Sequence, residues 1–279
     1  MKPTAFDFVR ASSLTEASRL LAESKGAARL IAGAQSLGPM LNLRLVRPTL
    51  LVDLNRAGLD GVVADGALTV GATTRQAALA GDRRVHPLVR EALPFVGHFV
   101  TRNRGTVGGS VAHADGAAEL PLCLVALDGK VVVAGPSGRR EIPAGAFFVT
   151  HFTTALATGE LVVETVWPLG EPGETAAFEE LALRAGDFAQ SMVAVVLRRD
   201  ADGIVVGAAL AVGAVSDRPI RLPEVEALLV GTRGSDAAAD AGALAATLVD
   251  PPGSIHASAR YLRALTGALT ARAIERAAA

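Results

Sequence analysis

The sequence predicts an α+β fold in which strands and helices occupy separate stretches of the 279-residue chain. Residues 1–57 have the pattern of a helix–strand–loop–strand unit, and residues 58–170 contain short strands with a few helices between them. Residues 175–279 show three strands followed by an Ala/Leu-rich helical tail. This grouping is typical of α+β proteins, because parallel α/β folds alternate strand and helix. The Gly- and Pro-rich stretch 170–174 predicts a linker before the C-terminal part.

A helix opens the first region, because apolar residues repeat at helical spacing after a capping-box pattern formed by Ser13 and Glu16. A short apolar strand at 29–31 runs directly into a loop at 32–36. A second strand is expected at 49–54, where a run of apolar residues follows Pro48. These elements predict a compact first region over residues 1–57.

The second region, 58–170, is rich in β-branched residues bounded by Gly and Asp, which predicts strands at 68–71 and 129–133. Between them, residues 85–99 have the pattern of a helix that Pro94 interrupts. A Gly-rich stretch from 102 to 119 follows and is expected to form a loop.

The C-terminal part begins with strands expected at 177–184, 191–199 and 204–215, joined by tight turns such as Asp200-Ala201-Asp202-Gly203. Apolar side chains on one face of residues 258–278 predict a final helix. The sequence therefore predicts a three-stranded antiparallel sheet with helices.

Composition narrows the classes of function. The chain carries 27 basic and 28 acidic residues, so its charge gives no attraction to nucleic acid or to anionic lipid. Its single cysteine, Cys123, can form neither an internal disulfide nor an iron–sulfur site, whose irons usually bind four thiolates. The longest apolar run, 204–215, is too short for a transmembrane helix, and the N-terminus has no apolar signal segment. We expect a soluble, cytoplasmic protein.

Two Gly-rich segments are candidates for ligand binding. The first, residues 32–36, follows a strand directly, and small residues there let the backbone approach a ligand closely. The second, residues 102–110, combines three glycines, two hydroxyls and two guanidinium groups, which suits a diphosphate. Neither matches a Rossmann or P-loop motif, and either could be only a structural turn.

Other candidate sites are weaker. His113, Asp115 and Glu119 could suggest a metal site, but the five histidines form no H-x-x-x-H pair, so no metal site is expected. Ser36 and Ser110 lie outside any G-x-S-x-G motif, which argues against a hydrolase. The segment 184–188 could contact a ligand, but its composition favours a turn leading into a strand.

Three motifs together resemble a known family: AGAQSL at 32–37, RNRGTVGGSVAHAD at 102–115 and RAGDFA at 184–189. Their order and spacing are similar to those of the medium, FAD-binding subunit of the xanthine dehydrogenase and carbon monoxide dehydrogenase family. This molybdenum hydroxylase resemblance covers essentially the whole chain. It implies a two-lobed FAD domain of the vanillyl-alcohol-oxidase (PCMH) type, with lobes at 1–57 and 58–170, followed by the C-terminal domain of that family at 175–279.

The resemblance also implies the cofactor and the partners. FAD would bind to this chain and relay electrons from two [2Fe–2S] clusters of a small subunit to an external acceptor. A large subunit would hydroxylate the substrate at a molybdenum cofactor, and a dimer of heterotrimers is expected. The flavin supplies the redox chemistry, so no catalytic side chain is expected here. The substrate and the acceptor, whether NAD, quinone or oxygen, are not specified by this sequence.

The resemblance assigns the cofactor contacts to both Gly-rich segments, to two acidic residues and to one apolar residue. These residues are Ile31, Ala32, Gly33, Ala34, Gln35, Ser36, Leu37, Thr106, Val107, Gly108, Gly109, Ser110, Asp115, Glu119 and Leu161. Two positions depart from the family pattern: Ala34 replaces a usual glycine and Gly116 replaces a usual proline. Because alanine disfavours φ > 0, the turn at Ala34 must adopt φ < 0 or carry strain of about 1 kcal/mol.

Two alternatives remain open on the sequence. The first is a stand-alone FAD-dependent oxidoreductase of the same fold, which would need acid–base residues over the flavin. The second is a nucleotide-binding or scaffold protein without a redox role. Visible absorbance separates the second alternative from both flavoprotein interpretations, and turnover by the isolated chain separates the first from the electron-relay subunit.

Overall fold

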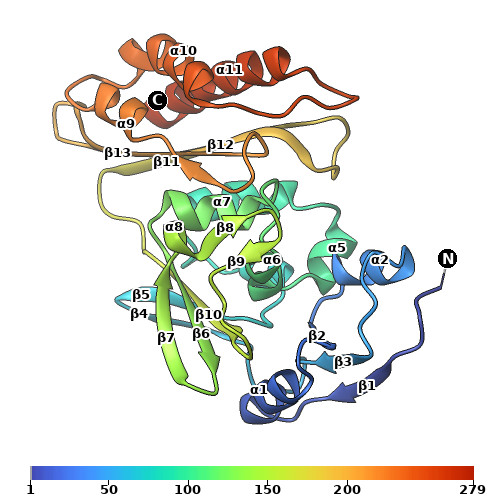
Figure 1. Cartoon of the computed structure of the whole chain (residues 1–279). Helices are drawn as coiled ribbons and strands as arrows, with labels where there is room; N and C mark the ends of the chain where they lie inside the picture. Colours follow the sequence, from blue (N-terminus) through green and yellow to red (C-terminus); the bar gives the residue numbers. More distant parts are fainter. Residues whose placement is uncertain (1) are drawn as a thin grey trace.

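The computed structural model describes residues 2–279 and contains three main sheets in chain order. In Figure 1 the N-terminal sheet and the C-terminal sheet lie at opposite ends of the molecule, with the central sheet and its helices between them. Within residues 2–279, none of the helices combines the length and the apolar character needed to cross a membrane.

The N-terminal sheet is small and parallel, with strand order β1-β3-β2. Its elements are β1 (Asp7–Arg10), α1 (Leu14–Glu23), β2 (Ala28–Ile31), α2 (Leu37–Asn42) and β3 (Leu50–Asp53). The expected cap of α1 is confirmed, because the Ser13 hydroxyl accepts the Glu16 backbone N–H at 3.2 Å. The Glu16 carboxylate, however, accepts from the backbone N–H of Ser12 and not from that of Ser13. The capping box is therefore shifted by one residue.

The central sheet is antiparallel and five-stranded, with order β4-β5-β10-β6-β7. Its strands are β4 (Val62–Asp65), β5 (Ala67–Gly71), β6 (Lys130–Gly135), β7 (Gly138–Pro143) and β10 (Leu161–Trp167). A two-stranded ribbon, β8 (Phe148–Thr150) and β9 (Thr153–Thr154), lies beyond the short helix α8 (Ala144–Phe147).

The helices between β5 and β6 differ from the sequence prediction. They are α3 (Gln76–Ala80), α4 (Pro87–Ala92), the 3-10 turn η1 (Leu93–Phe95), α5 (Phe99–Arg104), α6 (Val107–His113) and α7 (Glu119–Ala126). The helix expected at 85–99 is interrupted around Pro94, as predicted, because the chain tightens into η1 there; a separate helix, α5, then begins at Phe99. The loop expected at 102–119 is wrong in its Gly-rich part, which forms α6 with Thr106 as N-cap.

The C-terminal sheet contains the three expected strands and a fourth of two residues. Its elements are β11 (Glu174–Ala182), β12 (Ala189–Arg199), β13 (Val205–Gly213), β14 (Ile220–Arg221), α9 (Pro223–Leu229), the 3-10 turn η2 (Ser235–Ala237), α10 (Ala238–Leu248) and α11 (Ala259–Ala278). The final helix begins after Ser258, whose hydroxyl caps it by accepting the Tyr261 N–H at 3.2 Å.

Both faces of this sheet are buried. Because side chains alternate along a strand, Val193, Val195 and Leu197 pack with α10 and α11, whereas Met192 and Ala194 belong to the core shared with α4 and α7. Figure 1 shows α10 and α11 covering the outer face and α7 lying beneath the inner face. The sheet thus joins the C-terminal helices to the central part of the molecule.

Helices α10 and α11 approach each other through glycines. A Cβ added at Gly242 would lie 2.5 Å from the carbonyl oxygen of Gly267, and one added at Gly267 would lie 2.7 Å from the carbonyl oxygen of Gly242. Real Cβ atoms do not come that close to backbone atoms, so the two helices would have to separate.

We expect Gly242→Ala to destabilise the protein by about 1–3 kcal/mol, because the added methyl group overpacks the helix contact. Urea unfolding at constant pH measures the change. Gly145→Ala is the matched control, since an added Cβ there has no atom within 4 Å. Equal stability of the two variants would contradict the close helix contact.

Candidate functional site

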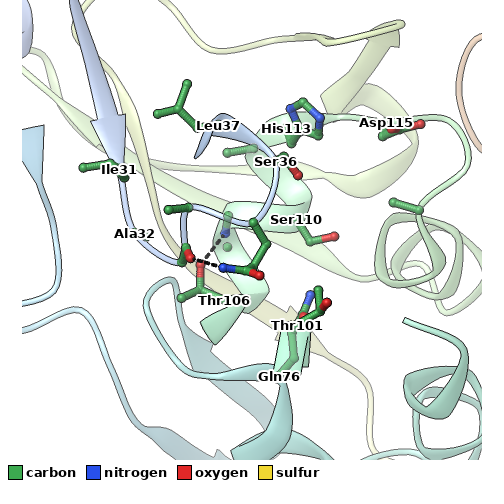
Figure 2. Close-up of a pocket in the computed structure, with 18 of the residues that line it drawn as sticks. Ile31, Ala32, Ser36, Leu37, Gln76, Thr101, Thr106, Ser110, His113 and Asp115 are labelled. Carbon is green, nitrogen blue, oxygen red and sulfur yellow. Dashed lines mark hydrogen bonds between the residues drawn. The ribbon is translucent and has the colours of Figure 1, made fainter. Parts of the chain in front are cut away.

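The main cavity has a volume of about 650 Å³, which is the size of a pocket for a large organic ligand. It lies where the loop after β2, the start of α3, the segment from α5 to α7, the strand β10 and the turn 186–188 meet. Figure 2 shows labelled side chains from these separate segments, among them Ser36, Gln76, Thr106, Ser110 and His113, arranged around one space.

One wall of the cavity is the loop 32–36, which is held against the end of α5. A Cβ added at Gly33 would clash with the Arg104 carbonyl oxygen and lie 2.8 Å from the Gly105 Cα. Arg75 and Asn55 secure this contact, because Arg75 donates to the Arg104 carbonyl and to Asn55 Oδ1 at 2.6 Å. Asn55 in turn donates to the Ala32 carbonyl at 3.0 Å.

Ala34 adopts the left-handed conformation, with φ of 62°. The expected alternative with φ < 0 is therefore excluded, and the loop carries the strain of a non-glycine residue in this region. Successive N–H groups around a left-handed residue can point into one concavity that suits an anion.

The backbone N–H groups of residues 33–37 do not donate to any protein acceptor within residues 2–279. The segment lines the cavity, so these donors are available to a ligand. Orphaned backbone donors are rare in folded proteins unless water or a ligand satisfies them.

The second Gly-rich segment is different, because its N–H groups are already used. Val107 donates to the Thr74 carbonyl, Gly108 to the Ala72 carbonyl, Gly109 to the Thr106 hydroxyl and Ser110 to the Thr106 carbonyl, at 3.0–3.2 Å. The N–H groups of residues 107–110 are therefore not free to hold a diphosphate. The Thr106 N–H, which donates to no acceptor within residues 2–279, and the side chains of this segment remain available to a ligand.

The glycine at position 108 allows two segments of the chain to pack closely. A Cβ there would lie 2.5 Å from the Ala72 Cβ, so the glycine lets α6 lie directly against the chain after β5. The space that a side chain would take at this position is occupied by the protein itself.

Gln76 is a cavity residue that the sequence did not reveal. Its side chain is buried, and its Oε1 atom has no hydrogen-bond partner within residues 2–279. An unpaired buried acceptor costs free energy, and this atom lies against Gly105, out of reach of a ligand in the cavity. No sequence motif marks Gln76, because it enters the cavity only through the fold of α3 against Gly105.

Two titratable side chains of the cavity have pKa values shifted toward their neutral forms. Burial raises the pKa of Glu119 to about 7, with Asp115 adding to the effect. Burial lowers the pKa of His113, whose ring packs against Phe152 with centroids 4.9 Å apart. Arg29 is the sole Lys or Arg among the described residues that line the cavity. An anionic ligand would therefore be held mainly by neutral donors.

The structure brings the predicted site residues together with one exception. Fourteen of them line the cavity, from Ile31 to Leu37 and onward to Leu161. Val107 does not, because its side chain is fully buried behind the wall and its N–H is used by Thr74. Thr101, Asp187 and Phe188 line the cavity in addition.

Comparison with known proteins confirms the resemblance. Residues 4–170 match the family model described as "FAD binding domain in molybdopterin dehydrogenase". Residues 176–277 match the "CO dehydrogenase flavoprotein C-terminal domain". Both matches agree with the α+β architecture and its small antiparallel C-terminal sheet.

Three relatives illustrate the range of the family. The alpha subunit of the 6-hydroxypseudooxynicotine dehydrogenase complex of Paenarthrobacter nicotinovorans is 40% identical, with 99% of this chain and 97% of the relative covered. The glyceraldehyde dehydrogenase medium chain of Sulfolobus acidocaldarius is 34% identical, with 99% of each chain covered. A crystal structure of the Cu,Mo-CO dehydrogenase superposes with a TM-score of 0.96 at 32% identity, covering 100% of this chain and 99% of the other.

Gly33→Ala should abolish retention of FAD, because the added Cβ cannot fit against Arg104 and Gly105 and so displaces the loop whose amides face the cavity. Fluorescence titration with FAD measures the affinity. Ala34→Gly is the control in the same loop, since glycine accepts φ of 62° without strain. Unchanged affinity in Gly33→Ala would show that this loop does not hold the cofactor.

The unliganded chain should lose stability as pH rises from about 4.5 to 7. Glu119 has a folded pKa above its unfolded value, so the folded state binds more protons in this range, and the penalty approaches about 3 kcal/mol above pH 7. Glu119→Gln should flatten the curve. Urea unfolding at pH 5, 7 and 8 tests this, and an equally steep loss in the variant would contradict the buried, protonated carboxyl.

Proposed function

This chain belongs to the family of molybdopterin dehydrogenases that carry this FAD-binding domain, as a flavoprotein subunit of an oxidoreductase, and we propose that it holds FAD in the main cavity and relays electrons there. The observation that supports the placement is the row of free N–H groups at residues 33–37, with Ala34 in the left-handed conformation. Neutral backbone donors hold a diphosphate without placing a mobile cation beside a redox centre.

The rest of the cavity fits the remaining parts of FAD. The hydroxyls of Ser36 and Ser110 and the carboxyls of Asp115 and Glu119 add polar contacts along the wall. Leu161 is a buried apolar residue of the same wall, suited to a ring.

The chain's own residues would bind, orient and shield the cofactor. The bound flavin supplies the redox chemistry, accepting and releasing electrons. Burial keeps Glu119 mostly protonated up to about pH 7, so this carboxyl can donate a hydrogen bond to the ligand. We assign no side chain as general base, in keeping with an electron relay.

The proposal that this chain has partner subunits rests on its family and on one exposed apolar surface. Three apolar side chains are exposed near the cavity: Phe188, which lines it, at 68%, and Phe99 and Val100, which precede the lining residue Thr101, at 68% and 55%. The turn that carries Phe188 packs against His98, just before α5, since a Cβ at Gly186 would lie 2.7 Å from the His98 ring. We propose that a small subunit with [2Fe–2S] clusters covers this apolar surface, because electron transfer requires short distances and exposed apolar groups mark protein contacts.

A large subunit with the molybdenum cofactor would hydroxylate the substrate. Relatives of this chain include the medium chains of a glyceraldehyde dehydrogenase and of a carbon monoxide dehydrogenase, so similar FAD subunits serve different substrates. We therefore place substrate choice on the partner, and we propose two FAD lobes at 1–57 and 58–170, a C-terminal domain at 175–279 and a dimer of heterotrimers.

The first experiment is to purify this chain with the proteins that accompany it and to record the visible spectrum, the released cofactor and the metal content. We expect flavin bands, FAD on acid release, and two further chains carrying iron and molybdenum. A colourless protein that also fails to bind added FAD would contradict the proposal. Substrate turnover by the isolated, FAD-loaded chain would instead identify a stand-alone flavoenzyme.

A further inference from the structure

Phe152 combines two features that do not stabilise the unliganded protein. It lies in the turn between β8 and β9 with φ of 54°, where a bulky side chain is strained and glycine or asparagine is tolerated better. Its side chain also lines the main cavity, and the residue is 58% exposed. A single exposed apolar side chain is ordinary, but one on a strained backbone at a cavity wall points to a role in ligand binding.

Backbone strain is concentrated at this part of the cavity wall. The Phe152 N–H donates at 3.0 Å to the carbonyl of Ala114, which itself has φ of 52°. Ala214, with φ of 65°, donates its N–H at 2.8 Å to the Gly116 carbonyl in the same loop after α6. Three of the seven non-glycine residues with positive φ in the described part of the chain therefore meet here. Such strain persists where the surrounding structure enforces it, which is typical of ligand sites.

The backbone around Phe152 is held from two sides. Arg218, in the segment between β13 and β14, donates to the Val149 carbonyl at 2.7 Å. The bond from Phe152 to Ala114 attaches the turn to the loop after α6. Both contacts use backbone atoms of the turn, so neither requires a phenyl ring at position 152.

Two imidazole rings lie beside the phenyl ring. Its centroid is 4.9 Å from that of His113 and 5.8 Å from that of His151, with interplanar angles of 37° and 34°. Aromatic side chains at nucleotide sites stack on planar heteroaromatic rings, which covers apolar surface on both partners. Phe188 is the other phenyl ring among the described residues that line the cavity, and it belongs to the surface assigned above to a partner.

We propose that Phe152 is the stacking residue of the main cavity, and that its ring packs on a planar heteroaromatic ring of the bound ligand. The stacking role rests on the proposed function for the identity of that ring, which is the isoalloxazine or the adenine of FAD. Covering the exposed phenyl ring would offset the strain at position 152. No covalent bond changes.

The test removes the ring and relieves the strain in one step. Phe152→Asn should weaken FAD binding by at least about fivefold in a fluorescence titration of the full chain, because the stacking partner is lost. The Tm of the unliganded variant should not fall, because asparagine tolerates a positive φ better than phenylalanine. A purely structural role would give the opposite result, with a lower Tm and unchanged affinity.

Two control variants accompany this one. Phe152→Tyr keeps an aromatic ring and should bind FAD as the wild type does. Phe8→Asn removes another exposed phenyl ring, 51% exposed on β1 and outside the cavity lining, and should leave the affinity unchanged.

Titrations with FMN and with ADP identify which ring is stacked. A loss of FMN affinity in Phe152→Asn assigns the isoalloxazine, and a loss of ADP affinity assigns the adenine. Either result supports the stacking role.

Unchanged FAD affinity in Phe152→Asn would overturn the stacking role while the proposed function stands. A loss that Phe152→Tyr shares would also overturn it, because the aromatic ring would then not be what the ligand needs. If the wild type binds none of FAD, FMN and ADP, the proposed function and the stacking role both fail.

Discussion

The structure depends on one close contact between backbone segments, in which the loop 32–36 packs against the end of α5. No side chain fits at Gly33, because the Arg104 carbonyl and the Gly105 Cα occupy the space. This contact joins the N-terminal parallel sheet to the central sheet and closes one side of the cavity. Arg75 and Asn55 tie the same two segments together through polar contacts. The cavity is thus formed by the junction of two regions and belongs to neither alone.

The two Gly-rich segments show that similar compositions serve different physical purposes. At 32–36 small residues leave the backbone donors free and exposed to the cavity, and a left-handed Ala34 accepts strain. At 105–110 the glycines permit tight packing of α6 on Ala72, and every N–H from 107 to 110 is used internally. The strained residue Ala34 therefore lies in the loop whose free N–H groups face the cavity. The segment 107–110, whose N–H groups are all used, forms a rigid part of the cavity wall.

The C-terminal sheet has a second role besides stability. Its outer face packs with α10 and α11, while its inner face completes the core shared with α4 and α7. Glu179 of β11 pairs with arginines of α11, whereas Glu180 beside it points to the inner face. The alternation of side chains along the strand thus gives two neighbouring glutamates different environments.

The sequence by itself determined the fold class, the three C-terminal strands, the capped helix after Ser13, the C-terminal helix and the family. These features depend on local periodicity, capping chemistry and motifs of adjacent residues, which can be recognised in the sequence alone. Of the fifteen residues that the resemblance assigned to the cofactor, all except Val107 line the cavity.

Only the tertiary structure decided which donors are free, that Gln76 lines the cavity and that residues 107–113 are helical. These facts depend on contacts between segments distant in sequence, such as Gly33 with Arg104 and Gly108 with Ala72. Burial and hydrogen-bond satisfaction are properties of packing, so local sequence patterns do not contain them.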